Sequence, residues 1–148
     1  MIPQYRGAFR SRRFESVVSE ATRLFSQGVK EINLIGQDTT YYGEDLGLKD
    51  GLPTLLESIC SSAPELKWIR LMYQYPGAVS DRLIEVIREL PQPCHIGFEA
   101  TGNYHRPLAY RLLIGGFDVS LHSYLARARY RVAILNARDK SDQKDAGI

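Results

Sequence analysis

The sequence predicts an α/β protein assembled from two unlike segments, residues 1–93 and 94–148. Helical and strand-like apolar patterns alternate along the chain, and polar loops follow the strands. The stretch 90–96, which contains two prolines, separates parts of different charge. Residues 1–93 carry 11 Lys+Arg against 12 Asp+Glu, whereas residues 94–148 carry 8 against 5. The basic excess after the junction favours a polyanionic partner there.

The first segment opens with a predicted amphipathic helix that Gly28 ends. Its apolar residues recur with the period of one buried helix face: Phe14, Val17, Val18, Ala21, Leu24 and Phe25. Residues 31–35 then predict a short buried strand, and residues 36–43 a polar loop.

The same order of elements follows once more. Pro53 suits the first turn of a helix that carries Leu55, Leu56, Ile59 and Cys60 and that Pro64 ends. Residues 68–72 predict the next strand, and Ser80 is a suitable N-cap for a helix with Leu83, Ile84 and Ile87. This alternation predicts parallel strands with helices on their outer face.

Two polar and aromatic loops, residues 37–42 and 73–76, follow these strands. Because functional groups gather at the carboxyl ends of parallel strands, we expect the loops to share one rim and to be the ligand-binding loops. The alternative is that their side chains only cap the end of the sheet.

Several motifs in this segment resemble the radical S-adenosylmethionine methylthiotransferases, and in particular the branch that modifies an aspartate of a ribosomal protein. They are Ile-Pro-Gln-Tyr-Arg-Gly at 2–7, Arg-Ser-Arg at 10–12, Gly-Gln-Asp-Thr-Thr at 36–40 and Trp-Ile-Arg-Leu-Met-Tyr at 68–73. The resemblance implies a partial TIM-barrel-like fold, a ribosomal-protein partner, S-adenosylmethionine and a [4Fe-4S] cluster. The expected S-adenosylmethionine rim is Gln37, Asp38, Thr39, Thr40 and Tyr42.

The cluster ligands of that family form a three-cysteine motif just before the Ile-Pro stretch, where this sequence has Met1. Cys60 and Cys94 match nothing in that motif, and we expect both to be buried thiols. Without three thiolates and an iron with an open coordination site, we expect the radical chemistry to be lost.

In the second segment, residues 95–99 predict a buried strand that carries Glu99 at its end. Pro107 begins a predicted helix with Leu108, Ala109, Leu112 and Leu113 on one face, and residues 118–121 predict another strand. A further helix, 125–135, is accompanied by Arg127, Arg131, Arg138 and Lys140. This basic row is a candidate phosphate-binding surface. A solvated helix face is the alternative.

Asp142 and Asp145 are three residues apart, so on a helix both would project from one face. Together with Glu99 they are candidate ligands and catalytic carboxylates for hard divalent cations such as Mg²⁺. A helix end with offsetting charges explains them equally well.

Residues 97–108 and 139–146 resemble the N-terminal RuvC-like domain of the insertion-sequence transposases that carry an Asp-Glu-Asp-Asp tetrad. The resemblance implies a partial RNase H/RuvC-like α/β fold, Mg²⁺, DNA and, in some members, RNA. It assigns Glu99, Asp142 and Asp145 to the tetrad. The first aspartate of the tetrad belongs upstream of Glu99, where methylthiotransferase-like sequence stands instead.

We therefore predict a fusion remnant of two enzymes that is inactive as either. A nucleic-acid-binding module is the alternative, and a residual metal-dependent nuclease is a third hypothesis. No apolar run is long enough for a membrane span, so we expect a cytoplasmic protein. The incomplete folds expose strand edges, which predicts self-association.

Overall fold

The computed structural model describes residues 7–90, 94–99 and 103–122. The chain divides into two compact units, Met1–Gln92 and Pro93–Ile148, which we describe separately. Within the described ranges, no helix has the length and apolarity needed to cross a membrane. The predicted helix 125–135, the basic residues Arg127, Arg131, Arg138 and Lys140, and the aspartates Asp142 and Asp145 lie outside the described residues.

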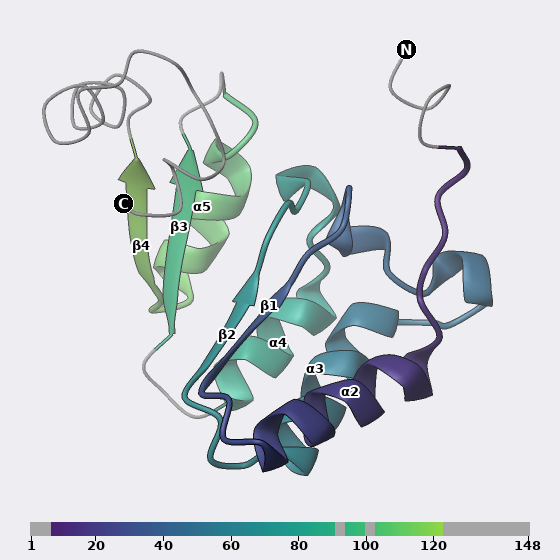
Figure 1. Cartoon of the computed structure of the whole chain (residues 1–148). Coiled ribbons are helices and arrows are strands. Elements are labelled where there is room, and N and C mark those ends of the chain that lie inside the picture. Colours follow the sequence, from purple (N-terminus) through teal and green to yellow (C-terminus); the bar gives the residue numbers. More distant parts are fainter. Residues whose placement is uncertain (1–6, 91–93, 100–102, 123–148) are drawn as a thin grey trace, which may run out of the picture. The chain divides into compact units, whose positions relative to one another are not determined.

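The first unit is a two-stranded parallel sheet packed against helices (Figure 1). Strand β1 (Glu31–Leu34) pairs in parallel with β2 (Trp68–Leu71), with Ile32 opposite Ile69. Helix α2 (Phe14–Ser26) precedes β1, α3 (Gly51–Ser62) connects the strands, and α4 (Asp81–Glu89) follows β2. The predicted α/β class and parallel pairing are confirmed, whereas two strands do not establish a barrel.

The core of this unit lies between the sheet and the helices α2 and α3. Four buried residues form its centre, Ala21, Ile32, Leu55 and Ile59. The apolar stripe predicted for α2 supplies Phe14, Val17 and Val18 as half-buried neighbours. Gly28 follows the helix with a φ of 88°, a left-handed conformation that ends it at little cost in glycine.

Helix α4 begins as predicted. The Ser80 hydroxyl accepts a hydrogen bond from the backbone N–H of Leu83 at 3.1 Å, which is the N-cap interaction. Leu83, Ile84 and Val86 are buried on one face of the helix. The N-cap therefore fixes the start of α4, and the apolar face holds it against the unit.

The strand at residues 31–35 was predicted to be buried, and this prediction is wrong for one face of the sheet. Ile32 is buried, but Ile35 is 67% exposed and Trp68 is 53% exposed. The helices cover a single face, so alternate side chains along each strand point away from the core. A short apolar run does not reveal whether a second layer covers it.

The second unit is a strand–helix–strand element, in the order predicted. Strand β3 (His95–Glu99) pairs in parallel with β4 (Asp118–His122), and α5 (Arg106–Ile114) lies between them in sequence. Leu108 and Leu112 of α5 are buried, but Leu113 is 57% exposed, so the predicted apolar face was too wide. β3 is also less buried than predicted, because Ile96 and Phe98 are only half-buried. Two strands and one helix do not establish a RuvC-like domain.

Candidate functional site

The loops that follow β1 and β2, residues 36–43 and 72–78, are joined by hydrogen bonds, and we call them the rim loops. The Thr39 N–H donates to the Tyr73 carbonyl at 3.0 Å, and the Thr39 hydroxyl donates to the Met72 carbonyl at 2.8 Å. The Tyr75 N–H donates to the Thr40 hydroxyl oxygen at 2.9 Å. The prediction that both loops share one rim is therefore confirmed.

Four of the five residues predicted to contact S-adenosylmethionine form hydrogen bonds within the first unit, and two of them, Thr39 and Thr40, join the rim loops. Thr39 is buried, and its hydroxyl and that of Thr40 bond to the second rim loop. The Asp38 carboxylate accepts a hydrogen bond from the Thr40 N–H at 3.0 Å, and the Tyr42 hydroxyl donates to the Arg12 carbonyl at 2.9 Å. Gln37, by contrast, is exposed. These four side chains therefore have hydrogen-bond partners within the fold, and the contact of all five residues with S-adenosylmethionine stays a prediction.

Residues 11 and 12 form a strap that is bonded to the first rim loop. The Ser11 N–H donates to the Asp45 carboxylate at 2.8 Å, and the Ser11 hydroxyl accepts from the Gly43 N–H at 2.8 Å. Hydrogen bonding from Ser11 lowers the pKa of Asp45. Burial raises the pKa of Tyr42, and the negative charge of Glu15 adds to that effect. The strap therefore bonds the segment just before α2 to the first rim loop.

The second rim loop has strained and exposed features that pattern reasoning did not identify. Tyr73 has a φ of 58°, which is left-handed and uncommon for a residue with a side chain. The Nε2 of Gln74 is buried and has no acceptor among the described residues. Tyr73 and Tyr75 are 64% and 48% exposed. In the sequence, this loop was indicated only by its position after a predicted strand. Its φ angles and side-chain burial could not be predicted, because they depend on the packed structure.

A small cavity lies beside the first rim loop. Its volume is about 130 Å³, and its walls include Thr40, Tyr42, Gly51 and Leu83. Sites for drug-sized ligands usually measure about 300–1,000 Å³. The cavity is therefore too small to enclose S-adenosylmethionine, and a ligand of that size would have to lie on the open surface of the rim.

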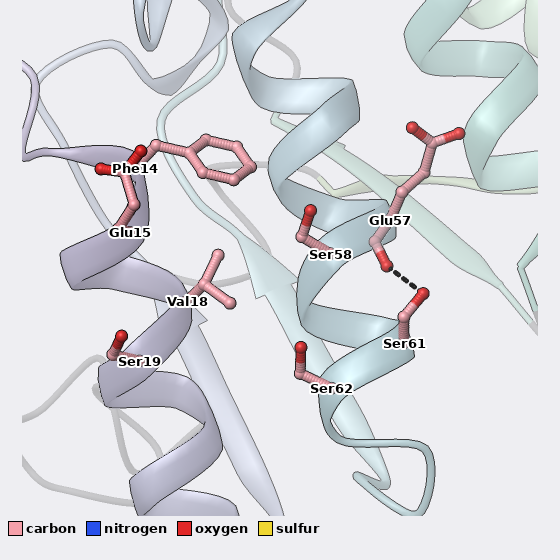
Figure 2. A pocket seen from close by; sticks show the side chains of 8 residues that line it. All are labelled: Phe14, Glu15, Val18, Ser19, Glu57, Ser58, Ser61 and Ser62. Atoms are coloured by element: carbon pink, nitrogen blue, oxygen red, sulfur yellow. Dashed lines mark hydrogen bonds between the residues drawn. The ribbon is translucent and has the colours of Figure 1, made fainter.

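A larger hollow of about 460 Å³ lies between α2 and α3 and is wide open (Figure 2). Phe14 and Val18 form its apolar part, and serines and two glutamates surround them. The Ser61 hydroxyl donates within its own helix to the Glu57 carbonyl at 2.8 Å, and the Glu57 carboxylate pairs with Arg82. No rim residue lines this hollow, and we assign it no ligand.

The cysteines of this chain do not fit an iron–sulfur cluster. Cys60 belongs to α3 in the first unit, whereas Cys94 precedes β3 in the second. Both are half-buried, not fully buried as predicted, and burial raises the pKa of both thiols, which disfavours the thiolate that binds iron. In the part of the chain that the structure describes, no three His, Cys, Asp or Glu side chains are placed to hold a metal ion.

In the second unit, polar side chains occupy one face of the β3–β4 sheet. His95 Nδ1 lies 2.7 Å from Asp118 Oδ2, and Ser120 Oγ lies 3.1 Å from His122 Nε2. The His122 ring lies over Gly97, where a Cβ would be 3.2 Å from Nε2. Glu99, the predicted carboxylate, ends β3 opposite His122 in the register. Its proposed partners Asp142 and Asp145 are outside the described residues.

Comparison with known proteins shows homology to ribosomal protein uS12 methylthiotransferase RimO over about 60% of the chain. The enzyme from Solibacter usitatus is 67% identical over 90 residues, which cover 60% of this chain and 19% of that protein. The enzyme from Koribacter versatilis is 62% identical over 92 residues (62% and 18%), and that from Chloroflexus aurantiacus is 50% identical over 94 (64% and 21%). The chain thus spans about a fifth of the length of these relatives. No protein-family profile matches it.

Proposed function

We propose that the first unit is the part of a ribosomal-protein methylthiotransferase that forms one side of its S-adenosylmethionine site. The hydrogen-bonded rim carries this proposal. Thr39 and Thr40 hold the loops of two adjacent parallel strands together at their carboxyl ends, which is where α/β folds bind ligands. The RimO relatives, which match a stretch about as long as this unit, support the choice of enzyme.

The exposed rim side chains suit the chemistry of S-adenosylmethionine. Its sulfonium cation and adenine ring favour contact with tyrosine faces, which Tyr73 and Tyr75 offer. The amide of Gln37 can donate to and accept from the polar ends of the ligand. Asp38, Thr39, Thr40 and Tyr42 position the loops. In such enzymes S-adenosylmethionine supplies its chemistry by reductive cleavage at an iron–sulfur cluster.

Since Cys60 and Cys94 do not fit that cluster, we propose that this chain alone has no turnover. The ribosomal-protein substrate named for the relatives would then belong to a complete enzyme of that type. Anaerobic reconstitution of the purified chain with iron and sulfide should give no stoichiometric [4Fe-4S] absorption. A stoichiometric cluster lost in a Cys60→Ala, Cys94→Ala variant would contradict this part of the proposal.

The ligand site is tested by calorimetric titration of the chain with S-adenosylmethionine. We expect weak binding, a roughly tenfold loss in Gln37→Ala or Tyr73→Ala, which corresponds to about 1.4 kcal/mol, and no loss in the remote control Ser61→Ala. Equal affinity in the rim variants and the wild type, or no binding at millimolar ligand, would refute a site at the rim. Circular dichroism establishes that each variant is folded.

For the second unit we propose weak nucleic-acid binding by a RuvC-like transposase remnant. The specific observation is the parallel β3–α5–β4 element, which places Glu99 at the carboxyl end of β3. In this proposal Glu99, Asp142 and Asp145 bind Mg²⁺, while Arg127, Arg131, Arg138 and Lys140 contact phosphates. The RimO relatives give this candidate no support.

Plasmid binding and nicking in the presence of Mn²⁺ test this second candidate. We expect salt-sensitive binding without strand cleavage, and weaker Mn²⁺ binding in Glu99→Gln and Asp145→Asn. Unchanged Mn²⁺ affinity in both variants would exclude the shared site, and nicking that both variants abolish would exclude the inactive remnant.

A further inference from the structure

The second rim loop ends in a tight turn with the sequence Tyr-Pro-Gly-Ala at residues 75–78. Pro76 begins the short helical turn Pro76–Ala78, and its own ring fixes the backbone φ there. The Ala78 N–H donates to the Tyr75 carbonyl at 3.0 Å, and the Tyr75 N–H donates to the Thr40 hydroxyl oxygen at 2.9 Å. Both backbone polar groups of Tyr75 are therefore bonded, which fixes the direction in which its side chain leaves the loop.

The Tyr75 ring packs back against Gly77. A Cβ at Gly77 would lie 3.0 Å from Cε1 of that ring, 3.1 Å from Cζ and 3.2 Å from the phenolic oxygen. Nonbonded carbon atoms prefer a separation of about 3.5–4.0 Å, so a side chain at this position would push the ring away. Gly77 has an ordinary φ. The space beside the ring, and not the backbone conformation, therefore favours glycine at position 77.

The same ring keeps much of its surface in contact with solvent. Tyr75 is 48% exposed, although Gly77 and the two backbone bonds hold it in place. A free surface side chain samples several rotamers, whereas a ring with a fixed orientation loses little conformational entropy when a ligand covers it. Tyr73, at 64%, is more exposed. Of the two exposed tyrosines in this loop, Tyr75 is therefore the one that is better preorganised for stacking.

We propose that the adenine of S-adenosylmethionine stacks on Tyr75, and that Gly77 is the positioning residue that holds this ring in place. The inference rests on the S-adenosylmethionine site proposed above and assigns one part of the ligand to one side chain. Adenine is a flat π-system, which stacks on an aromatic side chain whose surface is open. This assignment leaves Tyr73 for the sulfonium cation and Gln37 for the polar ends of the ligand.

The contact between Tyr75 and Gly77 is tested first without any ligand. An aromatic ring that packs against a glycine shifts the NMR resonances of the glycine α-protons through its ring current. We expect such a shift for Gly77 in the ligand-free chain, and we expect it to persist in Tyr75→Phe and to vanish in Tyr75→Leu. Unshifted α-protons in the wild type, or the same shift in Tyr75→Leu, would overturn the role of Gly77.

Ligand binding is then measured by NMR titration with S-adenosylmethionine and with methylthioadenosine, which keeps the nucleoside and lacks the amino-acid chain. Tyr75→Leu should weaken both ligands about tenfold, because it removes the stacking ring. Gly77→Ala should weaken both about threefold, because the displaced ring has to be ordered again on binding. Tyr75→Phe keeps the ring and should bind both ligands as the wild type does. A loss confined to S-adenosylmethionine would overturn the proposal, since it would place Tyr75 beside the amino-acid chain.

A double variant separates positioning of the ring from a general effect on the fold. In the Tyr75→Leu background, Gly77→Ala should cause no further loss of affinity, because no ring remains to be positioned. A further threefold loss there, in a chain that circular dichroism shows to be folded, would contradict the proposal. If Tyr73→Ala weakens binding and Tyr75→Leu does not, the stacking assignment alone is refuted. If the wild type binds neither ligand, the site at the rim is refuted and the stacking assignment with it.

Discussion

Thr39 and Met72 are joined across the rim of the first unit: the Thr39 hydroxyl donates to the Met72 carbonyl at a distance of 2.8 Å. Thr39 is 8% exposed, so the bond is shielded from water. The same residue also donates its backbone N–H to the Tyr73 carbonyl. One threonine therefore fixes the positions of two loops that are far apart in sequence.

Thr39→Val should weaken the rim while keeping its shape. Valine has nearly the same shape as threonine but no hydroxyl, so the Met72 carbonyl loses the hydrogen bond from this side chain. We expect the free energy of unfolding to fall by about 1–3 kcal/mol, measured by urea denaturation. Ser61→Ala removes an exposed hydrogen bond within α3 and should cost much less. Equal losses of unfolding free energy in the two variants would show that the bond at the rim stabilises the protein no more than an exposed hydrogen bond does.

Gly51→Ala should destabilise the start of α3. A Cβ at this position would lie 2.2 Å from the Tyr42 carbonyl oxygen, so the loop before the helix would have to move. We expect a loss of about 1–3 kcal/mol from overpacking. In the control Gly36→Ala, the nearest atom is Thr39 Cγ2 at 3.4 Å, an ordinary contact. A stable Gly51→Ala variant would mean that the close approach of the Tyr42 backbone is not required.

The stability of the first unit should fall at alkaline pH partly because of Tyr42. Its pKa is raised above 10.0 by burial first and by Glu15 second, so the folded state favours the neutral phenol. This contribution is fully present below pH 10 and is lost as the pH rises through the folded-state pKa. Ionisation also removes the proton donated to the Arg12 carbonyl.

Tyr42→Phe isolates this effect. The variant should show a smaller decrease in stability above pH 10 than the wild type, measured by denaturation at a series of pH values. Other groups titrate equally in both proteins, so the difference between the two curves reports on Tyr42. Identical alkaline slopes would exclude the proposed contribution.

Cys60 and Cys94 should react slowly with thiol reagents in the folded protein. Burial raises the pKa of both thiols above 9.0, so less thiolate is present near neutral pH than in an unfolded chain. We expect alkylation by iodoacetamide to be slower in buffer than in denaturant at the same pH. Single Cys→Ala variants assign each rate, and a fast reaction in the native protein would show that the thiolate is stabilised.

Pattern reasoning identified the elements of the described residues well. The period of α2, the Ser80 cap of α4 and the order β3, α5, β4 are all confirmed, because each depends on neighbours within a few residues. The shared rim could also be predicted, since parallel strands bring their carboxyl ends to one edge. These parts of the protein follow from local chemistry and chain direction.

Tertiary structure alone decided which side chains have partners and which are exposed. Thr39, Thr40 and Tyr42 were predicted as ligand contacts, and each also bonds within the fold to the second loop or the strap, which approach from distant positions in the chain. Ile35 was predicted to lie in a buried strand, yet it is 67% exposed, because the helices of the first unit cover only one face of the sheet. Helix periodicity and capping are encoded by residues that are close in sequence. The burial of a strand residue depends instead on whether a second layer covers its face of the sheet, which the neighbouring residues in the sequence do not encode.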